Sequence, residues 1–348
     1  YKLRGKLMLV SFIIIAHNEE KNLKNLLEDL NGQTYPKKLI EVILIDSISS
    51  DNTKNVMNEF RNSNKEFNKI IIKSNVKKIL PCGWNIAISE SKGDILLRVD
   101  AHSRIPKNFI EENVNCIKSG EKICGGYREN IILNKNHWKE TLLLAEKSIF
   151  GSSIAPYRRN ISKRYVSSIF HGAYSREVFE NTGLFNENLA RTEDNEMNYR
   201  IRKKGYKICF DPNIKSYQYT RNDLLKMLEQ KFLNGYWIGL TLGVCPKCIS
   251  IYHLIPFLFV LALAFTTINI FLNSYGIFII LGMLYSFLIL INTLFIIKNN
   301  EFNIFYIFLP IIFLLLHLSY GIGTFIGIIK LPFFKIKVYK GRKINEQN

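Results

Sequence analysis

Residues 10–20 read VSFIIIAHNEE and join a continuous apolar run, rich in β-branched side chains, to a polar turn. Leucines follow the turn at the spacing of one helix face: Leu23, Leu26, Leu27 and Leu30. An unbroken apolar run of this length is typical of a strand that is buried on both faces. The segment therefore predicts a strand at 10–16, a loop, and an amphipathic helix.

The same unit recurs along the first part of the chain. Apolar runs at 42–45, 70–72 and 95–99 are each followed by polar residues or a helical pattern, and two of the runs end directly at Asp46 and Asp100. Strands alternating with amphipathic helices predict an α/β fold with a mostly parallel, nucleotide-binding sheet of the Rossmann-like kind. Ligands bind such sheets beyond the carboxyl ends of the strands, where Asn18, Asp46 and Asp100 fall. Helices near 106–117 and 138–149 and a strand near 123–132 complete the expected domain.

The two ends of the chain differ in composition. Between Ile251 and Ile329 the only charged side chains are Lys298 and Glu301. We expect a catalytic domain at 1–220, an amphipathic helix region lying on the membrane at 221–250, a transmembrane region at 251–330, and a basic tail at 331–348. Segments 251–272 and 275–297 are each long enough to span a bilayer. The third stretch, 302–329, contains Pro310 and three glycines and is either one tilted span or a broken one.

The formal net charge of +18 suits an anionic membrane surface and phosphate-bearing substrates. A nucleic-acid partner is not expected, because the sequence contains no nucleic-acid-binding motif. The apolar run 7–15 is short and lacks a cleavage site, so we expect no signal peptide and a cytoplasmic catalytic domain on a multi-pass protein of the inner membrane. Three spans would place the tail outside the cell, whereas the six basic residues from Lys330 onward favour the inside.

Three groups of acidic residues suggest chemistry. Asp100 and His102 are oxygen and nitrogen ligands at a spacing that suits one Mg²⁺ or Mn²⁺ ion bridging a diphosphate, although Asp100 is equally well placed to cap the next helix. Asp46 is the first residue of a loop. Its carboxylate could accept a hydrogen bond from a nucleobase, or Asp46 could be an ordinary turn residue. Glu193 and Asp194 fall in the first turn of a predicted helix, where one acid caps the helix and the other is free to act as a general base.

Taken together, residues 9 to about 240 resemble the family 2 glycosyltransferases of the GT-A fold. Four motifs carry the resemblance: Ile13 to Glu20 resembles the opening strand and Asn-Glu turn, Asp46 to Thr53 the Asp-Asp-Gly-Ser-x-Asp-Gly-Thr loop, Gly93 to His102 the strand ending in Asp-x-Asp, and Thr192 to Asp194 the Glu-Asp motif. Within the family, the sequence is most similar to enzymes of succinoglycan-type exopolysaccharide synthesis. That likeness rests on the Asp-Ala-His form of the metal motif, His171 with Gly172, and the order Arg221, Gln230, Gly235.

The resemblance implies a role for each matched residue. Asp46 would contact the uracil, Asp100 the metal and the ribose region, and Asp194 would be the base, with Glu193 beside it. Other contacts to the donor nucleotide would come from Ala16, Asn18, Glu19 and Asn85. The divalent metal would be held by Asp100 and His102. Acceptor contacts would come from His171, Gly172, Arg221 and Gln230.

The sequence also departs from the family pattern. Ser47 and Ile48 replace an acidic residue and a glycine, and Asn52 replaces the second glycine of the loop. His102 replaces an acid in the metal motif, and Trp84 stands where a basic residue that contacts the base is common. These departures concern the loop geometry, the identity of the metal and the selectivity for uracil.

The predicted function is transfer with inversion of one sugar from a nucleotide diphosphate sugar, in the first place a UDP-sugar, to an undecaprenyl-diphosphate-linked oligosaccharide in exopolysaccharide or capsule synthesis. A polyprenyl-monophosphate sugar synthase is an open alternative. A processive polysaccharide synthase is another, but such chains carry Gln-x-x-Arg-Trp, and here no arginine lies between Gln230 and Trp237. A non-catalytic membrane scaffold would be expected to have lost acids that are present. The oligomeric state cannot be predicted from these residues.

Overall fold

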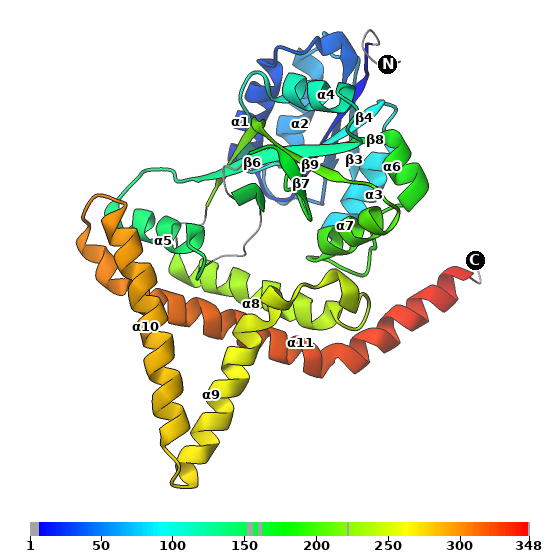
Figure 1. The fold of residues 1–348 in the computed structure, drawn as a ribbon. Helices are drawn as coiled ribbons and strands as arrows, with labels where there is room; N and C mark the ends of the chain where they lie inside the picture. The colour runs from blue at the N-terminus through cyan, green and yellow to red at the C-terminus, as the bar shows by residue number, and fades with distance from the viewer. Residues whose placement is uncertain (1–6, 152–155, 159–161, 221–222, 347–348) are drawn as a thin grey trace. The chain divides into compact units, whose positions relative to one another are not determined.

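A computed structural model describes residues 7–151, 156–158, 162–220 and 223–346, with side chains described as far as 336 (Figure 1). The chain divides into two units. The first comprises Tyr1–Asn130 and Ala155–Tyr219, and the second comprises Ile131–Ile154 and Thr220–Asn348. The segment 131–154 lies inside the range expected for the catalytic domain but belongs to the second unit.

A parallel half-sheet forms the start of the first unit, as predicted. Its strands are β1 (Val10–Ala16), β2 (Ile40–Asp46), β3 (Lys69–Ser74) and β4 (Ile95–Asp100), in the spatial order β3-β2-β1-β4. In the register, Ala16 lies opposite Asp46, and Ile15 lies opposite Asp100. The carboxyl ends of three neighbouring strands therefore meet at one edge of the sheet.

Two hydrophobic cores lie on opposite faces of this half-sheet, because successive side chains of a strand point to opposite faces. Phe12 and Ile14 of β1 pack into one core, whereas Ile13 and Ile15 pack into the other. The first core is covered by α1 (Glu20–Asn31), α2 (Thr53–Ser63) and α4 (Phe109–Lys118). The second is covered by α3 (Leu80–Glu90), α6 (Arg176–Thr182) and α7 (Glu193–Lys203).

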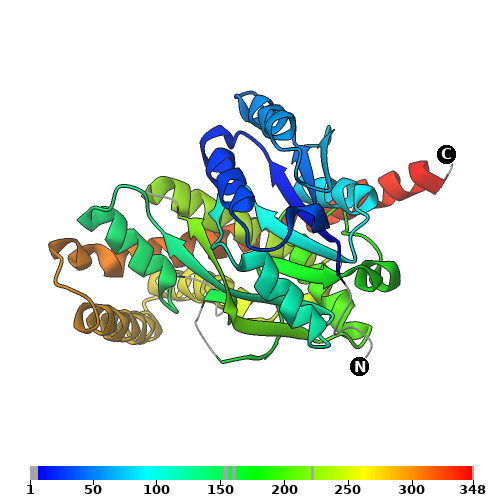
Figure 2. The same cartoon turned by 90° about the horizontal axis from the view of Figure 1, so that it is seen from above.

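The strands that follow Asp100 pair antiparallel, so the described residues form a mixed nine-stranded sheet (Figure 2). These strands are β5 (Ser103–Arg104), β6 (Ile123–Ile131), β7 (Arg164–Val166), β8 (Gly172–Ser175) and β9 (Ile208–Tyr219). β8 lies between β4 and β6, and β9 pairs with β5 and β7. β9 was not predicted, because Asp211, Pro212 and Asn213 interrupt its apolar pattern with residues that favour turns.

The second unit is helical in the residues described. It contains α5 (His137–Lys147), α8 (Leu224–Thr241), α9 (Ile255–Phe271), α10 (Gly276–Lys298) and α11 (Leu309–Glu346), with short 3₁₀ turns between them. Three segments of the described chain are long and apolar enough to cross a membrane: Ile251–Phe271, Gly276–Lys298 and Ile304–Ile336. The third stretch does not end near position 329 but continues as one helix through the basic tail.

Glycines hold α8 and α11 in close contact. A Cβ atom on Gly235 would lie 2.0 Å from the carbonyl oxygen of Tyr320, and one on Gly239 would lie 2.5 Å from that of Thr324. In the other direction, a Cβ on Gly327 would lie 2.2 Å from the carbonyl oxygen of Tyr236. Small residues spaced by four let two helix backbones approach in this way. The glycines of the third apolar stretch are therefore packing positions, not breaks in the helix.

We predict that Gly239→Ala destabilises the second unit, because the added methyl group would overlap the α11 backbone, and overpacking of this kind costs about 1–3 kcal/mol. The matched control is Gly282→Ala in α10, where nothing lies within 4 Å of the added Cβ. That change should be neutral or stabilise by up to about 1 kcal/mol, because alanine is the better helix former. Thermal unfolding in detergent would measure both, and equal melting temperatures would contradict the packing.

Candidate active site

Loops after β1 and β2 are tied together by side chains and lie at the common strand edge. Asn18 accepts a hydrogen bond from the Ser50 backbone at 2.8 Å, and its own N–H donates to the Ser49 hydroxyl at 3.0 Å. Asp46 is buried and accepts from the Ser49 N–H at 3.0 Å, while the Ala16 carbonyl accepts from the Ser47 N–H. The carboxylate of Asp46 is thereby fixed at the floor of this loop.

In the loop after β2, a residue other than glycine adopts a backbone conformation that favours glycine. Ile48 has φ = 55°, in the left-handed region that β-branched residues rarely adopt, and Asn18 has φ = 56°. Asparagine tolerates this region, whereas isoleucine is strained there, and such strain persists only where the surroundings impose it. The loop therefore has, at Ile48, the backbone conformation that glycine favours, although the residue is isoleucine.

A hydrogen-bonded chain runs from Glu19 through His102 to the second half of the sheet. The Glu19 carboxylate lies 3.3 Å from Nδ1 of His102, and Gln218 Nε2 lies 2.7 Å from Nε2 of the same ring. Arg128 in turn donates to the Gln218 side chain. Burial would lower the pKa of His102, but its contact with Glu19 and the negative charge of Asp100 raise it. Sequence reasoning missed Arg128 and Gln218, because the strand pairing that brings them here is not local.

His171 lies in the core and not at a surface. Its ring nitrogens lie 2.8 Å from the Ser216 hydroxyl and 3.1 Å from the Ser103 hydroxyl, and burial lowers the pKa of the imidazole to about 3. The ring is therefore neutral at physiological pH. Gly172, predicted with it as an acceptor contact, is buried in β8.

A largely shielded arginine, whose side chain is 11% exposed, lies beside acidic residues from a distant segment. Arg98 of β4 lies with its guanidinium 4.6 Å from the ring of Trp84 and 5.9 Å from that of Phe185. It also lies 4.0 Å from the Glu193 carboxylate, and its charge acts on Asp194. Trp84 thus packs against a cation supplied by β4.

The carboxylates around Arg98 have shifted pKa values. Burial, and then the charge of Asp194, raises the pKa of Glu193, whose Oε2 has no hydrogen-bond partner among the described residues. Loss of hydration also raises the pKa of Asp194, against the lowering effect of Arg98. Burial acts to raise the pKa of Asp100 as well, but the surrounding basic groups, including Arg98 and Arg128, lower it.

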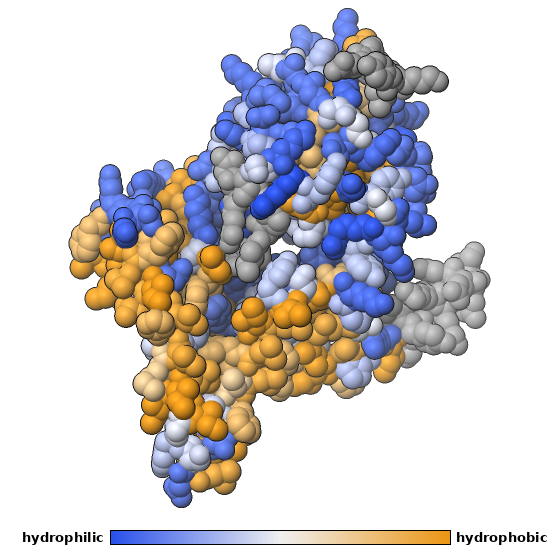
Figure 3. Space-filling view, in the orientation of Figure 1, coloured by the Kyte–Doolittle hydropathy of each residue, from blue (hydrophilic) through white to orange (hydrophobic). Residues whose placement is uncertain are grey.

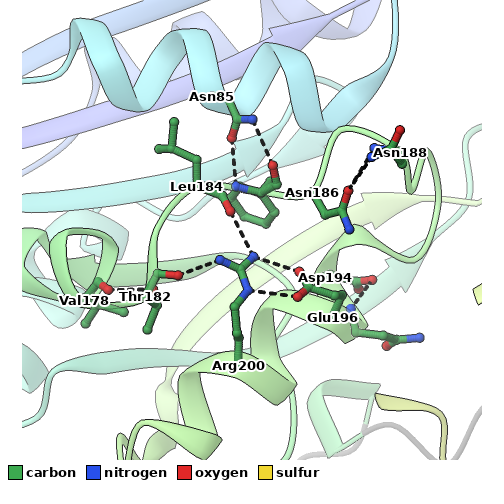
Figure 4. A network of polar contacts seen from close by, with 11 residues as sticks. Asn85, Val178, Thr182, Leu184, Asn186, Asn188, Asp194, Glu196 and Arg200 are labelled. Carbon is green, nitrogen blue, oxygen red and sulfur yellow. Dashed lines mark hydrogen bonds and ion pairs between the residues drawn. The ribbon is translucent and has the colours of Figure 1, made fainter. Parts of the chain in front are cut away.

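The loop before α7 is clamped in place (Figure 4). Arg200 contacts both oxygens of the Glu196 carboxylate, at 2.8 and 2.7 Å, and donates to the carbonyl oxygens of Thr182 and Leu184. From α3, Asn85 bonds both the N–H and the carbonyl of Phe185 at 2.9 Å. The Asn85 amide, predicted as a nucleotide contact, is therefore occupied in holding the chain that leads to Asp194.

The structure thus places Glu193 4.0 Å from Arg98, and the charges of Asp100 and Asp194 also act on this arginine. Asp46 ends the strand that lies two positions from β4 at the same edge of the sheet. Two strand spacings amount to about 10 Å, roughly the extent of a nucleoside diphosphate group. Of the predicted acceptor contacts, Gln230 lies in α8 of the second unit and is half-buried. Arg221 lies outside the described residues.

Within the described ranges, no group of three or more His, Cys, Asp and Glu side chains is arranged to hold a metal ion. Asp100 nevertheless offers a carboxylate of lowered pKa at the strand end, whereas both nitrogens of His102 already have partners. Mg²⁺ and similar ions commonly bind through one or two carboxylates, with phosphates and water supplying the remaining ligands. This site fits a metal held jointly with a diphosphate, with Asp100 as the residue best placed to hold it.

Comparison with known proteins agrees with this geometry. Residues 11–183 match the family model described as Glycosyl transferase family 2. A Methanococcus voltae protein, the dolichyl N-acetyl-alpha-D-glucosaminyl phosphate 3-beta-D-2,3-diacetamido-2,3-dideoxy-beta-D-glucuronosyltransferase, is 30% identical over 92% of this chain and 97% of its own length. The succinoglycan biosynthesis protein ExoA of Rhizobium meliloti is 24% identical over 65% of this chain and 67% of its own.

Among solved structures, the mannosyltransferase PcManGT from Pyrobaculum calidifontis, in complex with GDP-Man and Mn²⁺, aligns with a TM-score of 0.62. The alignment covers 92% of this chain and 88% of that one. At 14% identity this likeness concerns the fold alone.

Proposed function

Because the chain belongs to glycosyl transferase family 2 and takes its sugar from a nucleotide sugar, we propose that it adds a single sugar to a lipid-linked saccharide at the inner face of the cell membrane. The observation that carries the proposal is the cluster of Asp100, Glu193 and Asp194 around Arg98, in a chain whose other unit bears helices apolar enough to enter a bilayer. The relative from Methanococcus voltae, which matches over nearly its whole length, supports a lipid-linked acceptor by its name. The donor is a UDP-sugar in this proposal, and the product contributes to a surface polysaccharide or capsule.

Donor binding falls to the ends of β1, β2 and β4. Asp46 accepts the imide N–H of the base, and the Asn18 and Glu19 turn, held to the next loop by Asn18, borders the ribose and the diphosphate. Asp100 holds the diphosphate end together with a divalent cation, Mg²⁺ or Mn²⁺, which when bound neutralises charge on the departing diphosphate. His102 supports this end of the site through Glu19 and Gln218, and it ligates the cation only by giving up one of those contacts.

The two acidic residues at the start of α7 assist formation of the new glycosidic bond. The acceptor hydroxyl oxygen attacks the anomeric carbon from the face opposite the diphosphate, the bond from that carbon to the diphosphate oxygen breaks, and the hydroxyl proton passes to Asp194. The stereochemistry at the anomeric carbon is inverted because attack and departure occur on opposite faces. Glu193 is the more buried acid and faces Arg98, so its role is to position that cation, while Asp194 remains partly accessible.

The second unit associates with the membrane in this proposal. Its helices α9 and α10 are less buried within the protein than α11. In the most apolar part of Ile251–Phe271 only 6% of the residues are buried within the protein, and in that of Gly276–Lys298 only 11%. The share is 33% for Ile304–Ile336, because this helix packs on α8. Figure 3 shows hydrophobic side chains gathered over α9, α10 and the adjoining side of α8 and α11. Between positions 322 and 336, the exposed large apolar residues of α11 recur every three or four positions, at Ile322, Phe325, Ile329, Phe333 and Ile336.

A helix that packs one face on another helix of the protein has only its opposite, apolar face to bury in lipid, and it can do so while lying along the membrane interface. We infer that α9 and α10 cross the bilayer as a hairpin, while α8 and α11 lie along its inner surface. Two crossings return the chain to the side from which it started. This arrangement removes the conflict between three spans and a basic tail on the inside.

The first prediction concerns the base. Asp194→Asn should lower the transfer rate by about 10²-fold or more while leaving nucleotide-sugar binding unchanged, because the amide cannot accept the proton. Because burial raises the pKa of Asp194, activity of the unaltered enzyme should be lost, as the pH falls, at a value above the ordinary aspartate pKa of about 4. Steady-state rates and the pH profile of kcat/KM measure both effects.

Glu193→Gln is the matched control for the neighbouring acid. It removes the charge that faces Arg98 but keeps Asp194, so we expect a smaller loss of rate and a shifted pH profile. Full activity of Asp194→Asn, combined with an inactive Glu193→Gln, would reverse the two roles and contradict the assignment.

The second prediction concerns the metal. Asp100→Asn should weaken binding of the nucleotide sugar by about tenfold or more when Mn²⁺ or Mg²⁺ is present, and have little effect in EDTA, because the carboxylate acts through the cation. Asp46→Asn is the matched control, since it should weaken binding to a similar extent with and without metal. Calorimetric titration under both conditions distinguishes the two, and an Asp100→Asn variant that keeps the full metal dependence would exclude Asp100 as the ligand.

The third prediction concerns the side of the membrane on which the tail lies. A protease-cleavable epitope added after Asn348 should be protected in intact cells and cleaved in inverted membrane vesicles, because two crossings leave the tail inside. The same epitope inserted at Asn273, between α9 and α10, should show the opposite behaviour. Cleavage of the C-terminal epitope in intact cells would indicate that α11 crosses the membrane.

A further inference from the structure

The second unit contains a pocket of about 320 Å³ that the chemistry described so far does not use. Its walls come from α8, α9, α10 and α11 and from the residues that follow α5, so every wall belongs to the same unit. The volume is at the lower end of the range for pockets that hold small molecules or parts of larger ones. Ile255 and Leu288 line it and are about half exposed, at 54% and 49%, so the pocket can be reached from the apolar outer surface of the helices.

Polar groups lie in this otherwise apolar pocket. Lys231 of α8 and Tyr320 of α11 line it, and the hydroxyl of Tyr285 lies 2.8 Å from Nδ1 of His317 across the gap between α10 and α11. Lys231 belongs to α8, which we place along the inner surface of the membrane, at the level of the anionic lipid head groups. A lysine ammonium is a strong partner for a phosphate.

The remaining walls are largely aromatic. The ring of Phe259 stacks on Tyr285 with centroids 4.2 Å apart, and Phe150 lies 5.5 Å from the His317 ring. Ordinary acyl chains surround membrane helices on all sides and gain little from entering a formed pocket. A methyl-branched, unsaturated chain fills a cavity with flat aromatic walls better, and the lysine supplies a partner for the anionic head of such a lipid.

We propose that this pocket binds the phosphate-bearing end of a polyprenyl lipid, with Lys231 contacting the phosphate and the aromatic walls contacting the first isoprene units. The inference rests on the proposed function in one respect, because it assigns the lipid carrier of the acceptor to this pocket. It adds the place at which the carrier is held and the residues that distinguish it from bulk lipid.

Photolabelling tests the proposal directly. The full chain, reconstituted in phosphatidylcholine vesicles, is irradiated with a polyprenyl phosphate that carries a diazirine on its first isoprene unit, and the labelled peptides are identified. We expect labels on α9, α10 and α11 at residues of the pocket, and loss of labelling when unlabelled polyprenyl phosphate is added in excess. Labelling elsewhere, or equal loss with phosphatidylglycerol or inorganic phosphate, would overturn the proposal.

Two pairs of variants test the residues. Lys231→Met should weaken competition by the unlabelled polyprenyl phosphate by about tenfold or more, as expected when a charged hydrogen-bonding partner is removed. Lys226→Met, an exposed lysine on the same helix, should have no effect. Leu288→Trp should fill the pocket and abolish labelling, whereas Leu290→Trp, about 200° around α10 and similarly exposed at 54%, should not.

The failure of this proposal can be told apart from failure of the proposed function. Unchanged labelling and an unchanged KM for the lipid acceptor in both Lys231→Met and Leu288→Trp would exclude the pocket, although sugar transfer by the unaltered enzyme would continue. If the unaltered enzyme transfers sugar to no lipid-linked acceptor, the proposed function fails, and the photolabelling result still decides whether the pocket binds the lipid.

Discussion

The acidic residues at the start of α7 lie beside one largely buried cation, Arg98. Carboxylates from β4 and from the start of α7 approach each other within the protein, and without a positive charge among them their burial would drive them to their neutral forms. Arg98 supplies that charge from β4 itself and is held by the rings of Trp84 and Phe185. Removing one partner of such a buried set leaves an uncompensated charge, so the arginine, the rings and the acids have to be present together.

The cation also explains why two neighbouring acids differ. Glu193 faces Arg98 and is almost wholly buried. Asp194, the next residue of the helix, stays partly accessible to solvent. Burial raises the pKa of both carboxyl groups and Arg98 lowers both, but the pKa of Glu193 is raised further by the charge of Asp194. A general base works best when its pKa lies near the pH at which the enzyme operates, and burial balanced against one fixed cation is a way to reach that value.

The sequence predicted those parts of the fold that depend on neighbours along the chain. β1 to β4 and their terminal residues Asn18, Asp46 and Asp100 follow from apolar runs that end in polar turns, and α9 and α10 follow from length and composition. β9 did not, because its turn-forming residues are overruled by pairing with distant strands. Gln218 and Arg128 were missed with it. The occupied amide of Asn85 and the buried ring of His171 likewise depend on contacts with segments far away in the sequence.

The effect of glycine on the backbone was also hard to predict from the sequence, both where glycines are present and where one is absent. In the third apolar stretch, the glycines left both a single tilted span and a broken one open, and Gly323 and Gly327 lie where α8 and α11 touch through their backbones. In the loop after β2, the absence of glycine left the loop geometry open, and Ile48 adopts the left-handed conformation that glycine favours. The type of a residue indicates which backbone conformations cost little energy, whereas contacts with the surrounding structure determine which conformation the residue adopts. The strain at Ile48 is sustained by the hydrogen bonds that Asp46 and Asn18 make to the two residues after it, so the contacts that fix the Asp46 carboxylate at the sheet edge also impose the unusual backbone of Ile48.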